Sequence, residues 1–243
     1  MQRVVVLAVA TQPNPEADME LLDFARGPAL AAALAIMFTG IAWRLFGIFR
    51  LPNKPDYSEP RSSALWAGRL RGIVSRMWPH PEFRSSATLA TTNGYVYHIG
   101  LAIIAFAYLP HIHFIERLTG AHWPPLPEPV FYIAVGFTTV SLSVALLYRL
   151  SDPVLKLLSN FDDYFSWFVV MSSILTGMLA IQHPFRPGMP FPPPGNPTLV
   201  AIHLLAVDLL LIWLPFGKLA HAFLVFVSRG TTGAAMTRKG TRP

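Results

Sequence analysis

The chain has 243 residues, of which 53% are apolar and only 13% are charged. Soluble domains carry about 25% charged residues, so this composition excludes a soluble enzyme, a disordered chain and a simple nucleic-acid binder, and it predicts a membrane protein. The formal net charge is +6. The basic side chains lie in loops between apolar blocks, where they set topology rather than bind a polyanion.

The chain contains no cysteine. This excludes disulfide bonds, cysteine-ligated iron–sulfur clusters, thiolate-ligated haem and covalently attached c-type haem. The eight histidines are therefore the strongest nitrogen ligands that the chain offers to a metal.

Five stretches are apolar over the roughly 20 residues that a membrane-spanning helix needs. They cover residues 27–43 (continuing to 49), 85–115, 129–148, 164–185 and 198–226. In lipid every backbone polar group must be bonded within its own segment unless a barrel closes. We therefore predict an all-α integral membrane protein with five transmembrane helices in a bundle.

No convincing signal peptide precedes these spans, because the first apolar run is short and is followed by acidic residues. We divide the chain into a short polar N-terminal segment (1–26), a five-helix membrane domain (27–230) and a basic tail (231–243). Two proline-rich loops, 122–129 and 183–194, separate spans and resist helix formation.

The basic residues are distributed unevenly between the two sides of a five-span arrangement. Segment 44–84 holds eight Lys or Arg, the loop at Arg149 and Lys156 holds two, and the tail from Lys218 holds five. The opposite side has only Arg3, Arg26, Arg117 and Arg186. By the positive-inside tendency, the N-terminus lies outside and the C-terminus lies in the cytoplasm.

A short basic amphipathic helix is predicted in the first cytoplasmic loop. The apolar side chains recur at i, i+4, i+7, i+8 and i+11, and arginines lie between them. The apolar set is Trp66, Leu70, Ile73, Val74 and Met77, and the arginines are Arg69, Arg71 and Arg76. Such a helix rests on lipid headgroups or docks a cytoplasmic partner subunit.

Histidines inside the spans need an explanation, because ionisable groups are costly in lipid. His203 and His221 are 18 residues apart, so on one straight helix they share a face and are separated by about 27 Å. His98 lies level with His221, and the outer end of span 85–115 lies level with His203. This arrangement suits two stacked bis-histidine sites for b-type haem, whereas a single such histidine is more often a helix–helix hydrogen bond.

Two motifs around these histidines resemble a known family. Tyr97-His98-Ile-Gly-Leu101, and Ile202-His203-Leu-Leu205 leading into Leu214-Pro215-Phe-Gly-Lys-Leu-Ala-His221, resemble the cytochrome b (gamma) subunit of membrane-bound respiratory nitrate reductases. The resemblance covers roughly residues 28–230. The same architecture recurs in subunits of heterodisulfide-reductase-like and sulfite-reduction-associated complexes.

The resemblance implies five helices, an outside N-terminus and two b haems. His98 and His221 would ligate the inner haem, and His203 would ligate the outer one. The family's fourth ligand follows the first by ten residues within Gly-His, and this sequence has Ala107-Tyr108 there. His111 is the nearest substitute, brought to the iron by a shift of one helical turn near Pro110.

Other readings of the outer site stay open: His113 or Tyr108 as the ligand, or one haem only. The family also places a quinol site beside the outer haem, using a lysine that the loop after residue 109 lacks. Tyr108, His111, His113 and Glu116 are the candidate proton acceptors.

The resemblance implies a b-type cytochrome subunit in a bacterial or archaeal cytoplasmic membrane. It would pass electrons between the quinone pool and a cytoplasmic iron–sulfur subunit, with terminal catalysis in a further subunit and nitrate as the default substrate. Two alternatives remain: a proton-coupled transporter that uses the intramembrane His and Asp, and a haem-free membrane anchor for a cytoplasmic complex.

Two further residues have more than one interpretation. Asp208 lies about 140° around the helix from His203. It forms a hydrogen bond to Thr138, Ser141, Ser172 or Ser173, or it serves as a proton relay or haem-propionate neighbour. Lys218 extends to the cytoplasmic interface or pairs with an inner-haem propionate.

Overall fold

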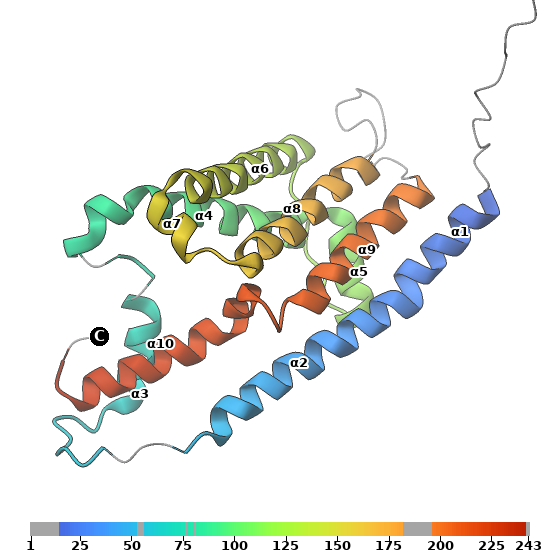
Figure 1. Cartoon of the computed structure of the whole chain (residues 1–243). Coiled ribbons are helices and arrows are strands. Elements are labelled where there is room, and N and C mark those ends of the chain that lie inside the picture. The colour runs from blue at the N-terminus through green and yellow to red at the C-terminus, as the bar shows by residue number, and fades with distance from the viewer. Residues whose placement is uncertain (1–14, 53–55, 76, 80, 182–195, 242–243) are drawn as a thin grey trace, which may run out of the picture.

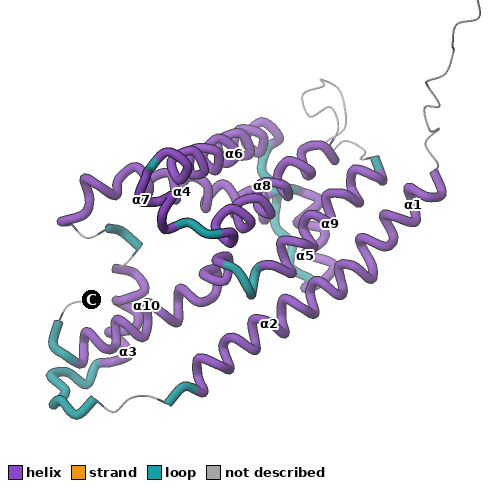
Figure 2. Tube along the Cα trace, in the orientation of Figure 1, coloured by secondary structure: helices purple, strands orange, loops and turns teal. Residues whose placement is uncertain are grey.

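The computed structural model describes residues 15–52, 56–75, 77–79, 81–181 and 196–241. Its regular elements are all helical over these residues (Figures 1 and 2). In chain order they are α1 (Pro15–Phe24), η1 (Ala25–Ala29), α2 (Leu30–Arg50), α3 (Leu65–Ser75), η2 (Pro81–Phe83), α4 (Arg84–Ala107), α5 (Leu109–Thr119), α6 (Glu128–Ser151), α7 (Pro153–Leu158), α8 (Phe161–Ile181), α9 (Pro197–Trp213), η3 (Lys218–Ala220) and α10 (His221–Arg238).

Four helices are long and apolar enough to cross a membrane. They are the continuous helix Glu16–Arg50, then α4, α6 and α8. A fifth span exists if α9 and the segment that ends with α10 are counted together, although the two are bent by 75°. The all-helical class is therefore confirmed over the described residues, and four to five of the helices have the length and composition of membrane spans. The expected proline-rich loop 183–194 and the residues His80, His183, Arg3 and Arg186 lie outside the described residues.

Three predicted boundaries differ from the structure. Residues 15–26 of the predicted N-terminal segment are helical, since α1 runs through the π-helical turn η1 into α2. The span 85–115 is two helices, α4 and α5, which meet at Tyr108. The tail 231–243 is largely the second half of α10.

The helices form neighbouring pairs along the molecule. The α8 and α9 helices lie side by side, and α1 and α2 run along the other flank of α9 (Figure 1). The α4 helix packs on α6, and α3 packs on α10. The α3 and α10 helices lie together at the lower left of Figure 1, α7 lies beside α6, and α9 begins on the opposite side of the molecule.

The main apolar core lies between α4, α6 and α8. Its buried members are aromatic and aliphatic side chains: Tyr108, Phe131, Tyr132, Val135, Leu142, Met171, Ile174 and Ile181. Close approach of α4 and α6 depends on Gly100, because a Cβ there would collide with the Thr138 hydroxyl. Asn93 and Ser141 join the same two helices, since the Asn93 amide donates to the Ser141 carbonyl and the Ser141 hydroxyl donates to Asn93 Oδ1.

The predicted amphipathic helix forms as α3, with bounds Leu65–Ser75. Its buried face carries Gly68 and Gly72, which contact Gly233 of α10 so closely that a Cβ on Gly72 would lie 2.6 Å from the Gly233 Cα. The apolar side chains Trp66 and Leu70 remain exposed on the opposite face. The α3–α10 pair is thus fixed by backbone contact and leaves the apolar face outward.

Candidate functional site: two facing pairs of histidines

Four of the predicted site residues form two pairs. The His98 ring, on α4, lies 5.9 Å from the His221 ring at the start of α10, measured between centroids, with planes at 85°. The His111 ring, in the first turn of α5, lies 6.2 Å from the His203 ring on α9, with planes at 20°. An imidazole–metal–imidazole unit with bonds of about 2 Å separates the ring centroids by about 6 Å. Both pairs thus have the spacing of two ligands on opposite sides of one metal ion.

All four Nδ1 atoms have acceptors nearby. His98 Nδ1 lies 2.7 Å from the Gly94 carbonyl and His221 Nδ1 lies 2.7 Å from the Lys218 carbonyl. His111 Nδ1 lies 2.8 Å from the Ile104 carbonyl. A carbonyl only accepts, so each of these Nδ1 atoms carries the proton and donates. The Nε2 atom is then left with the lone pair that a metal needs.

His203 follows the same rule through a hydroxyl. Its Nδ1 lies 3.4 Å from Thr176 Oγ1, and that hydroxyl donates to the Ser172 carbonyl at 2.6 Å. Because the threonine proton is already engaged, Nδ1–H of His203 is the donor. Gly177 makes room for this ring, since a Cβ at that position would lie 3.0 Å from its Cε1.

A break between α4 and α5 places His111 against His203. Tyr108 is extended (φ −91°, ψ 128°), and α5 restarts with a proline in its first turn. Pro110 has no N–H and its ring collides with the carbonyl four residues earlier, so α4 cannot continue through it. The predicted shift of one turn along a single helix is therefore wrong, because the chain turns at Tyr108 and starts a new helix instead.

Other groups take up the carbonyls that this break leaves free. Trp123 Nε1 donates to the Phe106 carbonyl. Leu126 N donates to the Ala107 carbonyl at 3.0 Å, and His111 Nδ1 donates to that of Ile104. The free carbonyls at the break thus find donors in the segment that follows, as buried backbone groups require. One of these donors is the His111 ring.

The other candidates for a fourth ligand are placed elsewhere. Tyr108 is buried in the core, stacked on Phe131 and edge-on to His111. The His113 ring lies 6.3 Å from the His122 ring, and His122 Nδ1 lies 3.1 Å from Glu116 Oε2. His113 is two residues from His111, so the helix turns it about 200° away.

A second break, between α9 and α10, places His221. Pro215 interrupts the helix, and Arg44 of α2 donates to the carbonyls of Pro215 and Phe216 at 2.7 and 3.4 Å. Gly40 lets α2 approach, since a Cβ there would lie 2.7 Å from Pro215. The expectation of one straight helix from His203 to His221 is wrong, and the shared helical face argued from it does not exist.

The start of α8 holds the same turn from the other side. Lys218 N donates to Asp162 Oδ1 at 3.1 Å, and Trp213 Nε1 donates to Ser166 Oγ at 3.1 Å. The Lys218 ammonium forms an ion pair with Asp163, and Arg149 of α6 pairs with the same carboxylate at 2.9 Å. Lys218 therefore has a protein carboxylate as its partner.

Sequence reasoning did not identify this Arg149–Asp163–Lys218 cluster. The feature of the sequence that could have indicated it is the acidic pair Asp162 and Asp163 at the start of an apolar span. Since the Lys218 carbonyl accepts from His221 Nδ1, the cluster fixes the residue that orients one of the paired histidines.

The helices that carry the inner pair do not pack extensively on each other in the described chain. The α4 helix makes its main contacts with α6, and α10 makes its main contacts with α3. His98 and His221 therefore face each other from helices that pack mainly on other neighbours. No three His, Asp or Glu side chains gather into a metal site among the described residues.

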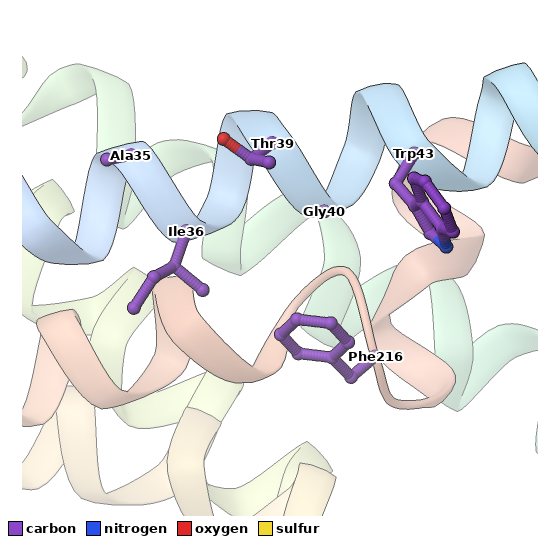
Figure 3. A pocket seen from close by; sticks show the side chains of 6 residues that line it. All are labelled: Ala35, Ile36, Thr39, Gly40, Trp43 and Phe216. Carbon is purple, nitrogen blue, oxygen red and sulfur yellow. The ribbon is translucent and has the colours of Figure 1, made fainter.

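An apolar pocket of about 400 Å³ lies apart from the histidines (Figure 3). It is formed by α2 and by Phe216 of the α9–α10 turn. Its lining is Ala35, Ile36, Thr39, Gly40, Trp43 and Phe216. With one hydroxyl and no ionisable group, this pocket has no chemistry of its own to contribute.

Comparisons with known proteins add one distant relative. A protein of Nitratidesulfovibrio vulgaris Hildenborough is 25% identical over 216 residues, which cover 86% of this chain and 91% of the relative. Its description names no function. No family model matches the chain, and no solved structure matches it.

Proposed function

We propose that this chain is a di-haem b-type cytochrome, the membrane subunit of a respiratory oxidoreductase. The observation that carries the proposal is the pairing of four histidines at ring separations of 5.9 and 6.2 Å, each with its Nδ1 next to an acceptor. His98 and His221 would hold the inner haem, and His111 and His203 the outer one. An iron porphyrin held by these histidines would supply one-electron transfer.

We propose that electrons pass between a quinone site beside the outer pair and a partner subunit on the basic side. The chain has no cysteine for a cluster, so we assign the iron–sulfur centre to a separate subunit on the basic, cytoplasmic side. Quinol would be oxidised beside the outer pair. With His111 paired and Tyr108 in the core, His113 and Glu116 are the proton acceptors that this side offers. The site thus supports a role as the electron-transfer subunit, with terminal catalysis elsewhere.

The membrane is the cytoplasmic membrane of a bacterium or archaeon in this proposal. The long apolar helices and the basic end of the molecule support it, and the resemblance of the helix-9 and helix-10 motif to the nitrate reductase gamma subunit points to the same class. The catalytic partner subunit would determine the terminal substrate, and nitrate is the default substrate by resemblance.

The test is haem content per chain by pyridine haemochrome, on protein purified in detergent from cells supplied with haem. We expect two haems in the wild type, and one in each of His98→Ala, His221→Ala, His111→Ala and His203→Ala. His113→Ala is the matched control, because it removes a neighbouring histidine of the same helix, and it should keep two. A haem-free wild type would overturn the proposal and favour an anchor or a transporter. A wild type with one haem that His111→Ala does not remove would confine the cytochrome to the inner pair.

A further inference from the structure

Asp208 is a buried carboxylate with no hydrogen-bond partner among the described residues. Its side chain lies near the middle of α9 (Pro197–Trp213), it is 4% exposed, and neither carboxylate oxygen has a donor nearby. The rest of α9 is apolar apart from Thr198 and His203. Buried polar atoms in proteins rarely lack a hydrogen-bond partner, so the state of the Asp208 carboxyl group needs an explanation.

The expected hydroxyl partners are bonded to other groups. Thr138 and Ser172 donate to carbonyls of their own helices. Ser141 donates to Asn93 of α4. The Ser173 hydroxyl donates to the Val169 carbonyl of its own helix and to the Ala206 carbonyl of α9. The hydrogen-bond reading of Asp208 therefore has no support in the structure.

No cation compensates Asp208 from the elements packed on α9. On the α1 and η1 flank, Arg26 pairs with Asp23 at the surface, and the other charged groups there are Glu16, Asp18 and Glu20. On α2, Arg44 donates to the carbonyls of the α9–α10 turn. At the start of α8, Asp162 accepts from Lys218 N and Asp163 pairs with Lys218 and Arg149.

The face that holds Asp208 is also tightly closed. Ala201, two helical turns earlier on the same face of α9, has no exposed surface, and neither do Ala25 and Ala33 on the neighbouring helix. Small side chains let the backbones approach and exclude water. An isolated carboxylate anion in such surroundings costs far more free energy than the neutral acid does.

The geometry points to Asp208 as a proton-binding site, a neutral carboxylic acid held inside the membrane domain at neutral pH. This inference concerns a proton rather than an electron, and it does not require haem. Where the proposed function also holds, the site lies five residues, or about 7.5 Å of helix rise, from His203. Loss of the proton would then place a negative charge near the outer haem and lower its reduction potential.

The first measurement is infrared spectroscopy of the full chain in detergent, with and without haem. A protonated carboxyl has a C=O stretching band that shifts in D₂O. We expect one such band that is absent in Asp208→Asn and displaced in Asp208→Glu, with the exposed Glu59→Gln as a control that leaves it unchanged. If Asp208→Asn and wild type have the same carboxyl bands at pH 7, Asp208 is ionised and the inference fails, whatever the haem content.

The second measurement uses the haem. Asparagine mimics the neutral acid, so Asp208→Asn should match the wild-type potential of the outer haem at pH 7 and diverge from it only at alkaline pH, as the wild type loses its proton. A higher potential in Asp208→Asn at pH 7 would show that the native group is already an anion. Absence of haem would remove this readout and contradict the proposed function, but the infrared result would stand.

Discussion

The hydrogen bond at Nδ1 of each paired histidine leaves its Nε2 free to bind a metal. The imidazole donates its Nδ1 proton to a carbonyl of its own neighbourhood or to Thr176, so the ring orientation is fixed by local structure. The sequence analysis named all four histidines, with His111 as the nearest substitute for a fourth ligand, and the structure places them in the pairs His98–His221 and His111–His203. The route by which His111 reaches His203 was predicted wrongly, because helical periodicity cannot predict where the chain turns and starts a new helix.

The ring planes of the two pairs differ, 85° in the inner pair and 20° in the outer pair. If each pair ligates a ferric haem, electron paramagnetic resonance should show two low-spin signals, because the orientation of the axial imidazoles splits the iron orbitals differently. We expect the signal of perpendicular ligands to vanish in His98→Ala and that of near-parallel ligands to vanish in His203→Ala. Loss of the same signal in both variants would contradict the assignment.

Asp163 is the residue on which the α9–α10 turn depends most. Its side chain is 3% exposed, but Lys218 and Arg149 are 49% and 35% exposed. Solvent can therefore rehydrate both cations when the carboxylate is lost. We expect Asp163→Asn to lower the free energy of unfolding by about 1–2 kcal/mol, less than for a fully buried pair.

Thermal unfolding in detergent would measure this loss, with the exposed Glu59→Gln as the control. A variant as stable as the wild type would show that the turn is held by Arg44 and Asp162 without the ion pair. Because His221 follows the turn directly, the inner haem should be the more easily lost of the two in Asp163→Asn.

At the scale of elements, the two proline breaks were the hardest features to predict. The sequence showed Pro110 and Pro215, but a proline inside an apolar run can kink a helix or end it. Whether the helix kinks or ends depends on which donors bond the carbonyls that the proline leaves free. Here the donors are Trp123, Leu126 and Arg44, which lie outside the broken helices. Apolar length alone predicted where the long helices lie, but it did not predict the breaks inside 85–115 and 198–226.

Replacing Pro110 by alanine tests the break before α5. On a continuous helix His111 would lie about 220° around from His98 and would leave His203. If the two pairs hold haem as proposed, we expect Pro110→Ala to reduce the haem content from two to one, the same result expected for His111→Ala. Pro129→Ala, in the first turn of α6, is the matched control. Two haems in Pro110→Ala would mean that tertiary contacts, rather than the proline, hold the break.

The glycine contact between α3 and α10 is a packing requirement. A Cβ on Gly72 would lie 2.6 Å from the Gly233 Cα and 2.7 Å from the Arg229 carbonyl, and backbone cannot move aside as a side chain can. We expect Gly72→Ala to destabilise the pair by about 1–3 kcal/mol, measured by protease sensitivity of the segment around α3. Gly47→Ala, with nothing within 4 Å of its Cβ, should be neutral or slightly stabilising.

At the scale of the whole molecule, the distribution of basic residues predicts an orientation. The chain lacks cysteine, so single cysteines report position without background. We expect Ala121→Cys to react with a membrane-impermeant maleimide in intact cells and Glu59→Cys to react only after permeabilisation. The reverse result would invert the topology, and labelling of both in intact cells would contradict five spans.

The contact between the loop before α3 and the end of α10 has a consequence for the order of synthesis. Arg61 N donates to the Arg238 carbonyl, and Arg238 pairs with Asp56, so this loop is bound by a residue that is translated 182 positions after Asp56. The ribosome must therefore synthesise the chain through α10 before the loop can close. Until then the loop remains accessible to proteases and chaperones, and a variant truncated before Arg238 would leave it open.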